Sequence, residues 1–361
     1  MYTKSDRTII WLDLFEFLTL KKKEEILSIF DDPSEVFDKF KKSYDKLKDI
    51  VTAEQFDKMC YMLDEQFLNN EIVNLESKGI RVLTYLNDKY PQQFFNYPDR
   101  PLLLYYKGDI SLLKTACVGI VGTRKPTIYG RQVTEKFAKA LASSGATIVS
   151  GLADGVDSIA HSSALSVKGK TIAVMGSGFE HIYPPRNFEL EKQIEQNGLV
   201  ITEYRPEVGP AHYHYPVRNR IIAGLSRAVL ITEASQKSGT MHTKNYCLDY
   251  GIDLYAVPGE ITSFASSGTN AILKSCQGAI ALSPDDIIED LHLINSYKPQ
   301  ISNFQLSFEE QAIFNVLDGE MHFDEIQIKT KIETKRLLTL LTTMELNGFV
   351  KKLSGNYYCK N

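Results

Sequence analysis

The feature that most constrains this chain is a series of short apolar segments that alternate with stretches of helical spacing. In chain order they are CVGIVG (117–122), ATIVSG (146–151), TIAVMGSG (171–178), LVITE (199–203), RAVLITE (227–233) and IDLYAVPG (252–259). Because these apolar runs are continuous rather than alternating, both faces of each strand must be covered. Helices between consecutive strands imply right-handed crossovers. The pattern therefore predicts an α/β fold with an extended, Rossmann-like, doubly wound parallel sheet.

The character of the chain changes on either side of this region, which predicts three domains. Residues 1–78 have no glycine and one proline, and their apolar residues have helical spacing, so we expect an all-helical domain. The sheet is expected within residues 79–290. Residues 291–304 are polar and contain proline, as linkers do. Residues 305–361 contain three helical segments and a short hairpin around 354–356, which predicts a winged helix.

The overall composition is that of an ordinary soluble protein with enough length to bury a core. The net charge is −4, so a phosphate-bearing partner must be met by a local cationic surface. The five cysteines include no C-x-x-C pair, which favours reduced thiols in a cytoplasmic protein and argues against a zinc ribbon. The apolar run TIIWLDLFEFLTL is interrupted by Asp13 and Glu16, so we expect an amphipathic helix and no membrane insertion.

Cationic residues gather in three windows that open where strands give way to helices. The windows 117–131, 208–227 and 234–248 together hold eight Lys or Arg and no Asp or Glu. Residues 110–290 as a whole hold 17 basic and 17 acidic residues, so the charge is sorted toward these loops. Parallel strands end at one edge of a sheet, where helix N-termini offer amide groups to anions. The loops therefore predict a phosphate-binding surface at that edge.

The first window contains the turn GTRKP, in which Gly122 permits close backbone approach while Arg124 and Lys125 supply charge. Tyr213 and Tyr215 supply aromatic faces beside the cations of the second window. Aromatic rings interleaved with Arg and Lys are typical of a groove for single-stranded nucleic acid, because bases stack on the rings while the cations follow the phosphates.

Other motifs do not support a nucleotide-hydrolysing or metal-dependent enzyme. KGKT (168–171) lacks the first glycine of a Walker A loop, and GSG (176–178) lacks the third glycine of a dinucleotide fingerprint. In DGVDSIAH (154–161) we expect Asp154 or Asp157 to cap the following helix and His161 to be a satisfied interior residue. No metal or cofactor is expected.

The ordered segments resemble the motifs of one family. They are GTR, SGLADGVDSIAH, GKTIAVMGSG, YPPRN, YPVRNRIIAGLS, TEASQKSGT and AVPG, and they resemble the DNA-processing protein A family, also called DprA or Smf. The resemblance covers about residues 85–285, and the flanks are similar to the family's sterile-alpha-motif-like and winged-helix domains. It implies a cytoplasmic, non-enzymatic homodimer that binds and protects incoming single-stranded DNA and helps load RecA recombinase in natural transformation.

The resemblance also implies DNA contacts in the three loops that the charge distribution selects. Many relatives have Phe where Tyr215 stands, and a Lys where this chain has His212, which is neutral for much of the time near pH 7. The predicted DNA-binding residues are Gly122, Thr123, Arg124, Lys125, Ser150, Gly151, Tyr215, Arg218, Asn219, Arg220, Lys237, Ser238, Gly239 and Thr240.

The alternative from another functional class is a nucleotide phosphoribohydrolase-like enzyme, whose Gly-Gly-x-Gly-Thr-x-x-Glu loop carries a catalytic Glu. Alignment of Gly239-Thr240 with that loop places Thr243 at the Glu position, so no general acid or base is evident there. Glu233 and Glu203, near strand ends, are the remaining carboxylates that this alternative could use.

The predicted winged helix has a poor charge balance for DNA binding. Residues 305–361 contain 7 basic and 8 acidic residues. We therefore expect this domain to contact protein or support a dimer, although Lys351 and Lys352 in the wing leave DNA contact as the alternative.

Overall fold

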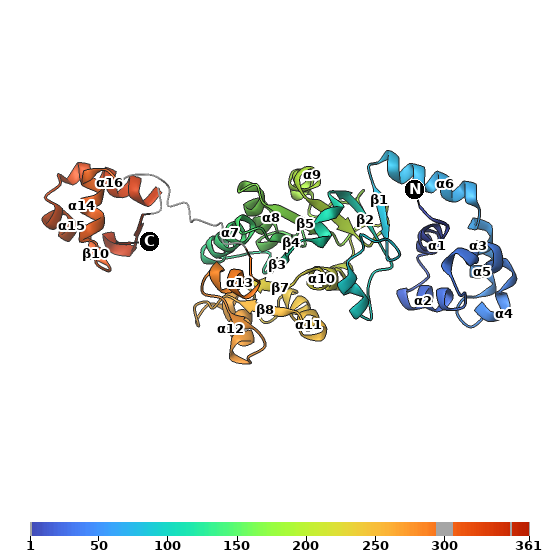
Figure 1. Cartoon of the computed structure of the whole chain (residues 1–361). Helices are drawn as coiled ribbons and strands as arrows, with labels where there is room; N and C mark the ends of the chain where they lie inside the picture. Colours follow the sequence, from blue (N-terminus) through green and yellow to red (C-terminus); the bar gives the residue numbers. More distant parts are fainter. Residues whose placement is uncertain (1, 294–305, 347–348, 361) are drawn as a thin grey trace. The chain divides into compact units, whose positions relative to one another are not determined.

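A nine-stranded sheet organises the larger part of the chain (Figure 1). The computed structural model describes residues 2–293, 306–346 and 349–360, and the chain divides into two compact units, 1–297 and 298–361. Most of the predicted linker, 294–304, lies outside the described residues.

Six parallel strands form the centre of this sheet, and all six coincide with predicted apolar segments. They are β3 (Cys117–Val121), β4 (Thr147–Ser150), β5 (Lys170–Val174), β6 (Leu199–Thr202), β7 (Ala228–Ile231) and β8 (Asp253–Ala256). Their order is β6-β5-β4-β3-β7-β8. The chain adds β4, β5 and β6 on one side of β3 and then adds β7 and β8 on the other side of β3. The predicted doubly wound sheet is confirmed.

Three edge strands complete the sheet, and the sequence analysis did not include them. β1 (Arg81–Thr84) and β2 (Leu103–Gly108) are antiparallel and extend the sheet beyond β6. β9 (Ala279–Ile280) pairs in parallel with β8 at the opposite edge.

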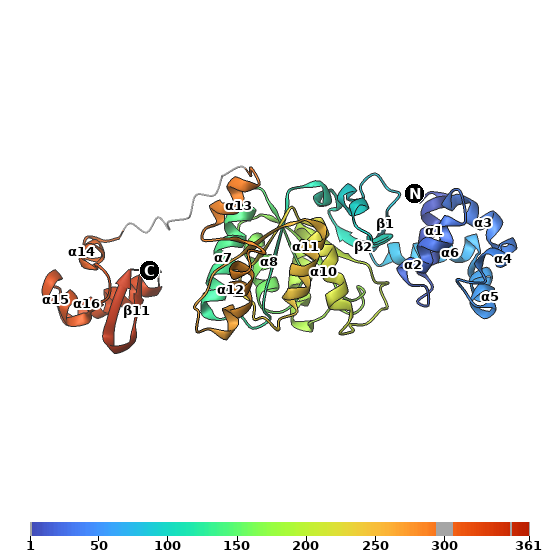
Figure 2. The same ribbon diagram turned by 90° about the horizontal axis from the view of Figure 1, so that it is seen from below.

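Helices cover both faces of the sheet, as continuous apolar strands require. One face carries α7 (Ile128–Ser143), α8 (Val156–Ser166), α9 (Phe188–Asn197) and α13 (Pro284–Asp290). The other face carries α10 (His214–Leu225), α11 (Thr240–Tyr250) and α12 (Ser267–Lys274), which come nearest the viewer in Figure 2.

Strand β3 illustrates how the two cores form. Successive side chains of a strand point to opposite faces. Val118 and Ile120 pack in one core with Phe137 of α7, whereas Cys117 packs in the other core with Ile221 of α10.

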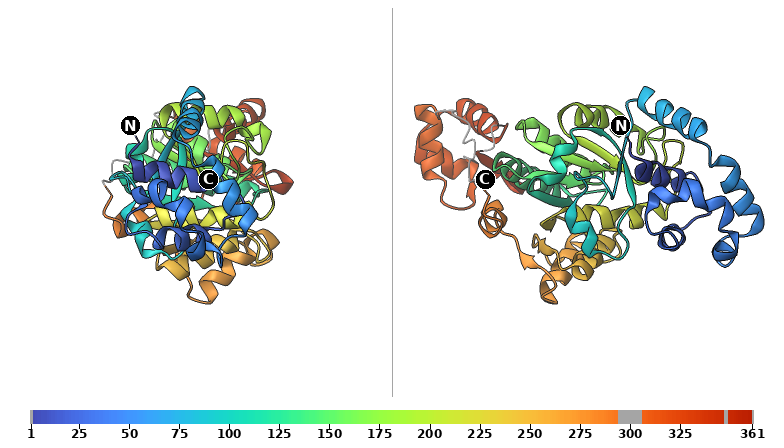
Figure 3. Two further views of the ribbon diagram at one scale, coloured as in Figure 1. Left: turned by 90° about the vertical axis from the view of Figure 1, so that its right-hand side faces the viewer. Right: turned by 45° about the vertical axis from the view of Figure 1, so that its right-hand side comes forward.

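The N-terminal part consists of helices that dock against the β1–β2 edge of the sheet (Figure 3). They are α1 (Lys4–Asp13), α2 (Leu20–Ser28), α3 (Val36–Lys39), α4 (Tyr44–Leu47), α5 (Ala53–Met62) and α6 (Glu65–Ser77). The all-helical prediction is confirmed, but the apolar run 8–20 is not one helix, because α1 ends at Asp13. Tyr105 of β2 donates a 2.8 Å hydrogen bond to Asp13. The predicted boundary after residue 78 falls between α6 and β1, yet both sides share one core.

The smaller unit is the predicted winged helix. It contains α14 (Phe308–Val316), β10 (Met321–His322), α15 (Phe323–Thr330), α16 (Thr334–Leu346), β11 (Val350–Lys352) and β12 (Tyr357–Lys360). The strands form an antiparallel sheet in the order β10-β12-β11, and the hairpin around 354–356 is confirmed. Ile313, Leu337, Met344 and Tyr358 contribute to its own core.

Across the described ranges of both units, no helix combines the length and the apolar character that crossing a bilayer would require.

Candidate functional site

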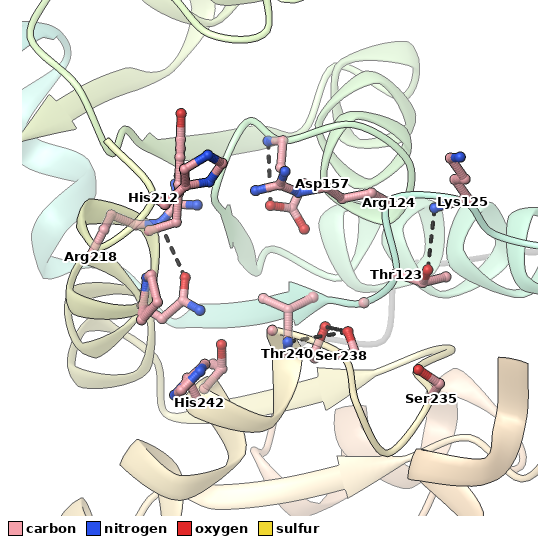
Figure 4. Close-up of a pocket in the computed structure, with 18 residues that line it drawn as sticks. Thr123, Arg124, Lys125, Asp157, His212, Arg218, Ser235, Ser238, Thr240 and His242 are labelled. Atoms are coloured by element: carbon pink, nitrogen blue, oxygen red, sulfur yellow. Dashed lines mark hydrogen bonds between the residues drawn. The ribbon is translucent and has the colours of Figure 1, made fainter. Parts of the chain in front are cut away.

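A cavity of about 490 Å³ opens at the carboxyl ends of β3, β4 and β7 (Figure 4), and we call it the groove. The strand order reverses between β3 and β7, and open α/β sheets bind ligands in the crevice at such a switch point. Ten of the fourteen predicted DNA-binding residues line the groove: Gly122, Thr123, Arg124, Lys125, Tyr215, Arg218, Asn219, Ser238, Gly239 and Thr240. Most of the residues selected from the sequence therefore lie together in one cavity. The sequence did not predict which of their side chains are accessible.

Three loops are hydrogen-bonded together to form the wall that carries Arg124. The amide of Thr123 donates to the carbonyl of Glu233 at 2.8 Å, and the amide of Val156 donates to the carbonyl of Thr123 at 3.2 Å. A Cβ on Gly122 would lie 2.6 Å from a methyl carbon of Val156 and 2.8 Å from the Glu233 carbonyl oxygen. Only glycine fits this approach, so the turn after β3 is held rigidly between the loops after β4 and β7.

The two carboxylates that the enzyme alternative could use are occupied elsewhere. The buried carboxylate of Glu233 accepts hydrogen bonds from the amide and hydroxyl of Thr127, at 2.8 and 2.6 Å, at the start of α7. Glu203 binds Arg220 through both oxygens, at 2.7 and 2.8 Å. Neither Glu lines the groove, whereas Thr243 does. The groove therefore has no Glu in the position that hydrolysis would require.

Three exposed cations belong to the groove or stand next to it. Arg124 and Lys125 line it, and Lys237 lies outside the lining but adjoins Ser238, which belongs to it. Within the described ranges, no carboxylate forms an ion pair with any of these three residues. In the same ranges, the backbone amides of Arg124 and Gly239 have no hydrogen-bond partner. These charges and amides are available to an anionic ligand.

Tyr215 is less accessible than the sequence suggested. Its ring packs so closely on Gly176 that a Cβ there would lie 2.9 Å from a ring carbon. The guanidinium carbon of Arg124 lies 5.2 Å from the ring centroid, in a cation–π contact. Burial raises the pKa of the Tyr215 hydroxyl. A base that stacks on the face under Arg124 must displace this cation.

Arg218 lines the groove but is only 4% exposed. Its guanidinium donates to the backbone carbonyls of Gly151 and Val174, and to the side-chain oxygen of Asn219 at 3.2 Å. The guanidinium covers Gly151 so closely that a Cβ there would overlap it. Burial lowers the pKa of Arg218. Arg218 thus ties α10 to the ends of β4 and β5 and places its charge at the floor of the groove.

The structure places Arg220 and Ser150 away from the groove, contrary to the prediction. Arg220 is 5% exposed and is held by Glu203 and, at 3.6 Å, by Asp99. Residues two apart on a helix point to different faces, so Arg218 and Arg220 cannot both face the groove. Ser150 is fully buried and its hydroxyl donates to a strand carbonyl. Gly151 also lies outside the lining, beneath Arg218.

Asp157 is a groove residue that the sequence analysis assigned to a different role. The expected capping of α8 by Asp154 or Asp157 is wrong, because the N-cap is Gly155 and no side chain caps the helix. Asp157 instead accepts hydrogen bonds from the amides of Gly151 and Ala153, at 3.1 and 3.4 Å, and lines the groove. Burial raises the pKa of its carboxyl, against the opposing effect of nearby Arg218. Its position shortly after the end of β4 was the sequence signal that could have identified it as a groove residue.

His161 was predicted to be a satisfied interior residue; it is interior, but its Nε2 has no hydrogen-bond partner among the described residues. It is fully buried, and its Nδ1 lies 2.7 Å from the hydroxyl of Thr171. Burial lowers the pKa of His161 to about 3, so the ring is neutral near pH 7. In the parts of the chain that the structure describes, no three His, Cys, Asp or Glu side chains come together as metal ligands.

Comparisons with known proteins give a consistent result. The family model described as DNA recombination-mediator protein A matches residues 81–292, and the model described as DprA winged helix domain matches residues 298–356. DNA processing protein DprA of Bacillus subtilis is 38% identical over 232 residues, which cover 63% of this chain and 77% of that protein. Protein Smf of Escherichia coli is 34% identical over 295 residues, 78% of each chain.

Two solved structures resemble this chain. The X-ray structure of DNA processing protein A from Streptococcus pneumoniae has a TM-score of 0.68 and 32% identity, covering 80% of this chain and 98% of that one. A structure of DNA processing protein A from Helicobacter pylori, described as giving insights into its single-stranded DNA binding mode, has a TM-score of 0.54 and 36% identity. It covers 59% of this chain and 95% of that one.

Proposed function

This chain belongs to the DNA recombination-mediator protein A family, and on that premise we propose that its groove binds single-stranded DNA independently of sequence. The resemblance predicted from the ordered motifs is confirmed by the family match. The family handles single-stranded DNA in recombination and transformation and is not a family of enzymes.

The observation that carries the proposal is the set of unpaired cations at the sheet's switch point. Arg124, Lys125 and Lys237 have no carboxylate partner among the described residues, and they stand beside backbone amides that are free to bind anions. Each unpaired cation can neutralise a phosphate and release its counterions, which favours a polyanion without reading its bases. The relative from Helicobacter pylori, 36% identical, is described as binding single-stranded DNA.

In the proposed binding mode, phosphates lie along the turn after β3 and the loop after β7, against Arg124, Lys125 and the amides of Arg124 and Gly239. The charge of Arg218 lies at the floor of the groove, close to the carboxyl of Asp157. His212 also lines the groove and is exposed. A base reaches Tyr215 only after Arg124 moves from its ring onto a phosphate.

We further propose that this cytoplasmic protein acts as a homodimer, protects incoming single-stranded DNA and helps load RecA recombinase during transformation. Membership of the family supports this role. Two linked grooves on one strand would raise avidity by roughly 10² to 10⁴, provided that the strand reaches both. Sedimentation equilibrium tests the dimer directly, because a monomer at all concentrations contradicts it.

A titration against single- and double-stranded oligonucleotides of equal length, across a salt series, tests DNA binding itself. We expect the protein to prefer the single strand, with log affinity falling linearly with log salt by about 0.7 per phosphate neutralised. Affinity that does not depend on salt, or equal affinity for the duplex, contradicts the proposal.

A further inference from the structure

A second cavity lies on the other side of the segment that begins α10. Its volume is about 660 Å³, and it is bounded by the N-terminal helical part, the start of β2 and residues 203–220. Much of its wall is apolar and includes Phe15, Leu18, Leu102 and Val217. We call it the N-terminal cavity.

The groove and the N-terminal cavity are lined by different residues of the same segment. His212, Tyr215 and Asn219 line the groove, whereas Tyr213 and Val217 line the N-terminal cavity. Residues three or four apart on a helix share a face, so the two sets form two faces of the first turns of α10. A strand that leaves the groove across the start of α10 therefore reaches the N-terminal cavity directly.

Tyr213 presents an aromatic ring at this crossing. It is 72% exposed, although most large aromatic side chains are buried where packing allows. Its ring contacts His214 edge to face, with centroids 4.5 Å apart, and His214 in turn stacks on Tyr204 at 4.1 Å. The contact supports the ring from one side and leaves most of its surface open to a flat ligand.

The charges around the N-terminal cavity favour an uncharged ligand. Asp13 is paired with Lys23 at 2.6 Å, and Glu203 is paired with Arg220 at 2.7 Å, so these carboxylates are neutralised. Of the residues lining the cavity, Glu16 forms no ion pair within the described ranges, and an unpaired carboxylate disfavours a phosphate.

One buried nitrogen atom of a lining residue also lacks a hydrogen-bond partner within the described ranges. Nη1 of Arg220 has no hydrogen-bond partner in the described part of the chain. Leaving a buried polar atom unpaired is unfavourable. A base with an acceptor on its edge reaches Nη1 of Arg220 only if the side chains that cover it move, because this atom has almost no exposed surface.

We propose that the N-terminal cavity takes one nucleobase of the strand whose phosphates lie in the groove. This inference rests on the proposed function. The base lies over Tyr213 and enters the cavity, while its phosphate stays in the groove near Arg124. The N-terminal helical part thereby becomes part of the DNA-binding surface.

Photocrosslinking and affinity measurements with the full chain test the proposal. The probe is an oligothymidylate carrying one 5-iodouracil at successive positions. At one position we expect a crosslink to Tyr213 or another lining residue of the N-terminal cavity, identified by mass spectrometry. Tyr213→Ala should weaken binding of the unmodified oligothymidylate roughly 5- to 100-fold, the loss expected for one base stack. Tyr213→Phe should retain most of the affinity, because it keeps the ring.

The matched control is Tyr61→Ala, because Tyr61 is 88% exposed on α5, outside both cavities, and should leave affinity unchanged. If Arg124→Ala weakens binding while Tyr213→Ala does not, and crosslinks form only in the groove, this inference is overturned and the proposed function stands. If neither Arg124→Ala nor Tyr213→Ala changes the affinity, the proposed function itself fails, and this inference fails with it.

Discussion

At the scale of single residues, Gly151 shows how the groove depends on a missing side chain. A Cβ on Gly151 would overlap the guanidinium of Arg218, which ties α10 to the ends of β4 and β5. We expect Gly151→Ala to lower the free energy of unfolding by about 1–3 kcal/mol, as overpacking does, and to weaken DNA binding. Thermal unfolding checks the first effect. Gly239→Ala is the control, because no atom lies within 4 Å of the added Cβ; equal melting temperatures for the two variants would contradict this account.

The raised pKa of Glu191 predicts how the free energy of unfolding changes with pH. It is 3% exposed on α9, and burial, with a smaller effect of nearby Glu195, raises its pKa to about 7. A carboxyl group whose pKa is raised by folding adds most to the free energy of unfolding below its unfolded pKa of about 4.3. This stabilisation is lost as the pH rises from there through the folded pKa. Glu191→Gln should therefore remove a decline in the free energy of unfolding of at most about 4 kcal/mol between these two pH values.

Urea unfolding of wild type and Glu191→Gln across this pH range measures the effect. The variant should be the more stable protein above pH 7, where wild-type Glu191 is ionised in the fold. Parallel stability curves for the two proteins would show that Glu191 is not responsible.

At the scale of secondary-structure elements, Glu233 joins the end of β7 to the start of α7. Glu233→Ala leaves the amide and hydroxyl of Thr127 without their acceptor, in a buried site. We expect a loss of about 1–3 kcal/mol of stability and weaker DNA binding, because the same loops hold Arg124. The control is Glu260→Ala, which removes an exposed carboxylate. Wild-type melting behaviour in Glu233→Ala would contradict the link.

The central strands could be predicted from sequence, but the edge strands could not. Strands covered on both faces require continuous apolar runs, and these are visible in the sequence. β9 has only two residues, both exposed, so no apolar pattern marks it. β1 and β2 join the sheet as antiparallel strands outside the alternation of strand and helix that guided the prediction.

The candidate site was predictable as a set of loops rather than as individual contacts. The charge pattern and the glycine turn predicted correctly that Arg124 and Lys125 lie at the groove. The positions of these two residues depend only on where β3 ends. The positions of Arg218 and Arg220 depend on which face of α10 each occupies and on which carboxylates lie nearby. Glu203 and Asp99, the partners of Arg220, come from distant parts of the chain and carry no local signal.

At the scale of the whole molecule, the winged helix is a separate compact unit with its own core. On an oligonucleotide too short to reach two grooves, a chain truncated after residue 297 should bind single-stranded DNA with an affinity within about threefold of the full chain, because residues 305–361 carry 7 basic and 8 acidic residues. Oligonucleotide titration measures this. Full-length Lys351→Ala is the companion variant, and a large loss of affinity in both proteins would place DNA on the wing.

The salt dependence of single-strand binding in Arg124→Ala tests whether Arg124 neutralises a phosphate of the bound strand. Arg227→Ala is the matched control, because Arg227 is exposed at the amino end of β7, opposite the groove. If Arg124 neutralises a phosphate, the slope of log affinity against log salt should become shallower by about 0.7 in Arg124→Ala and stay at the wild-type value in Arg227→Ala. A wild-type slope in Arg124→Ala would contradict the account.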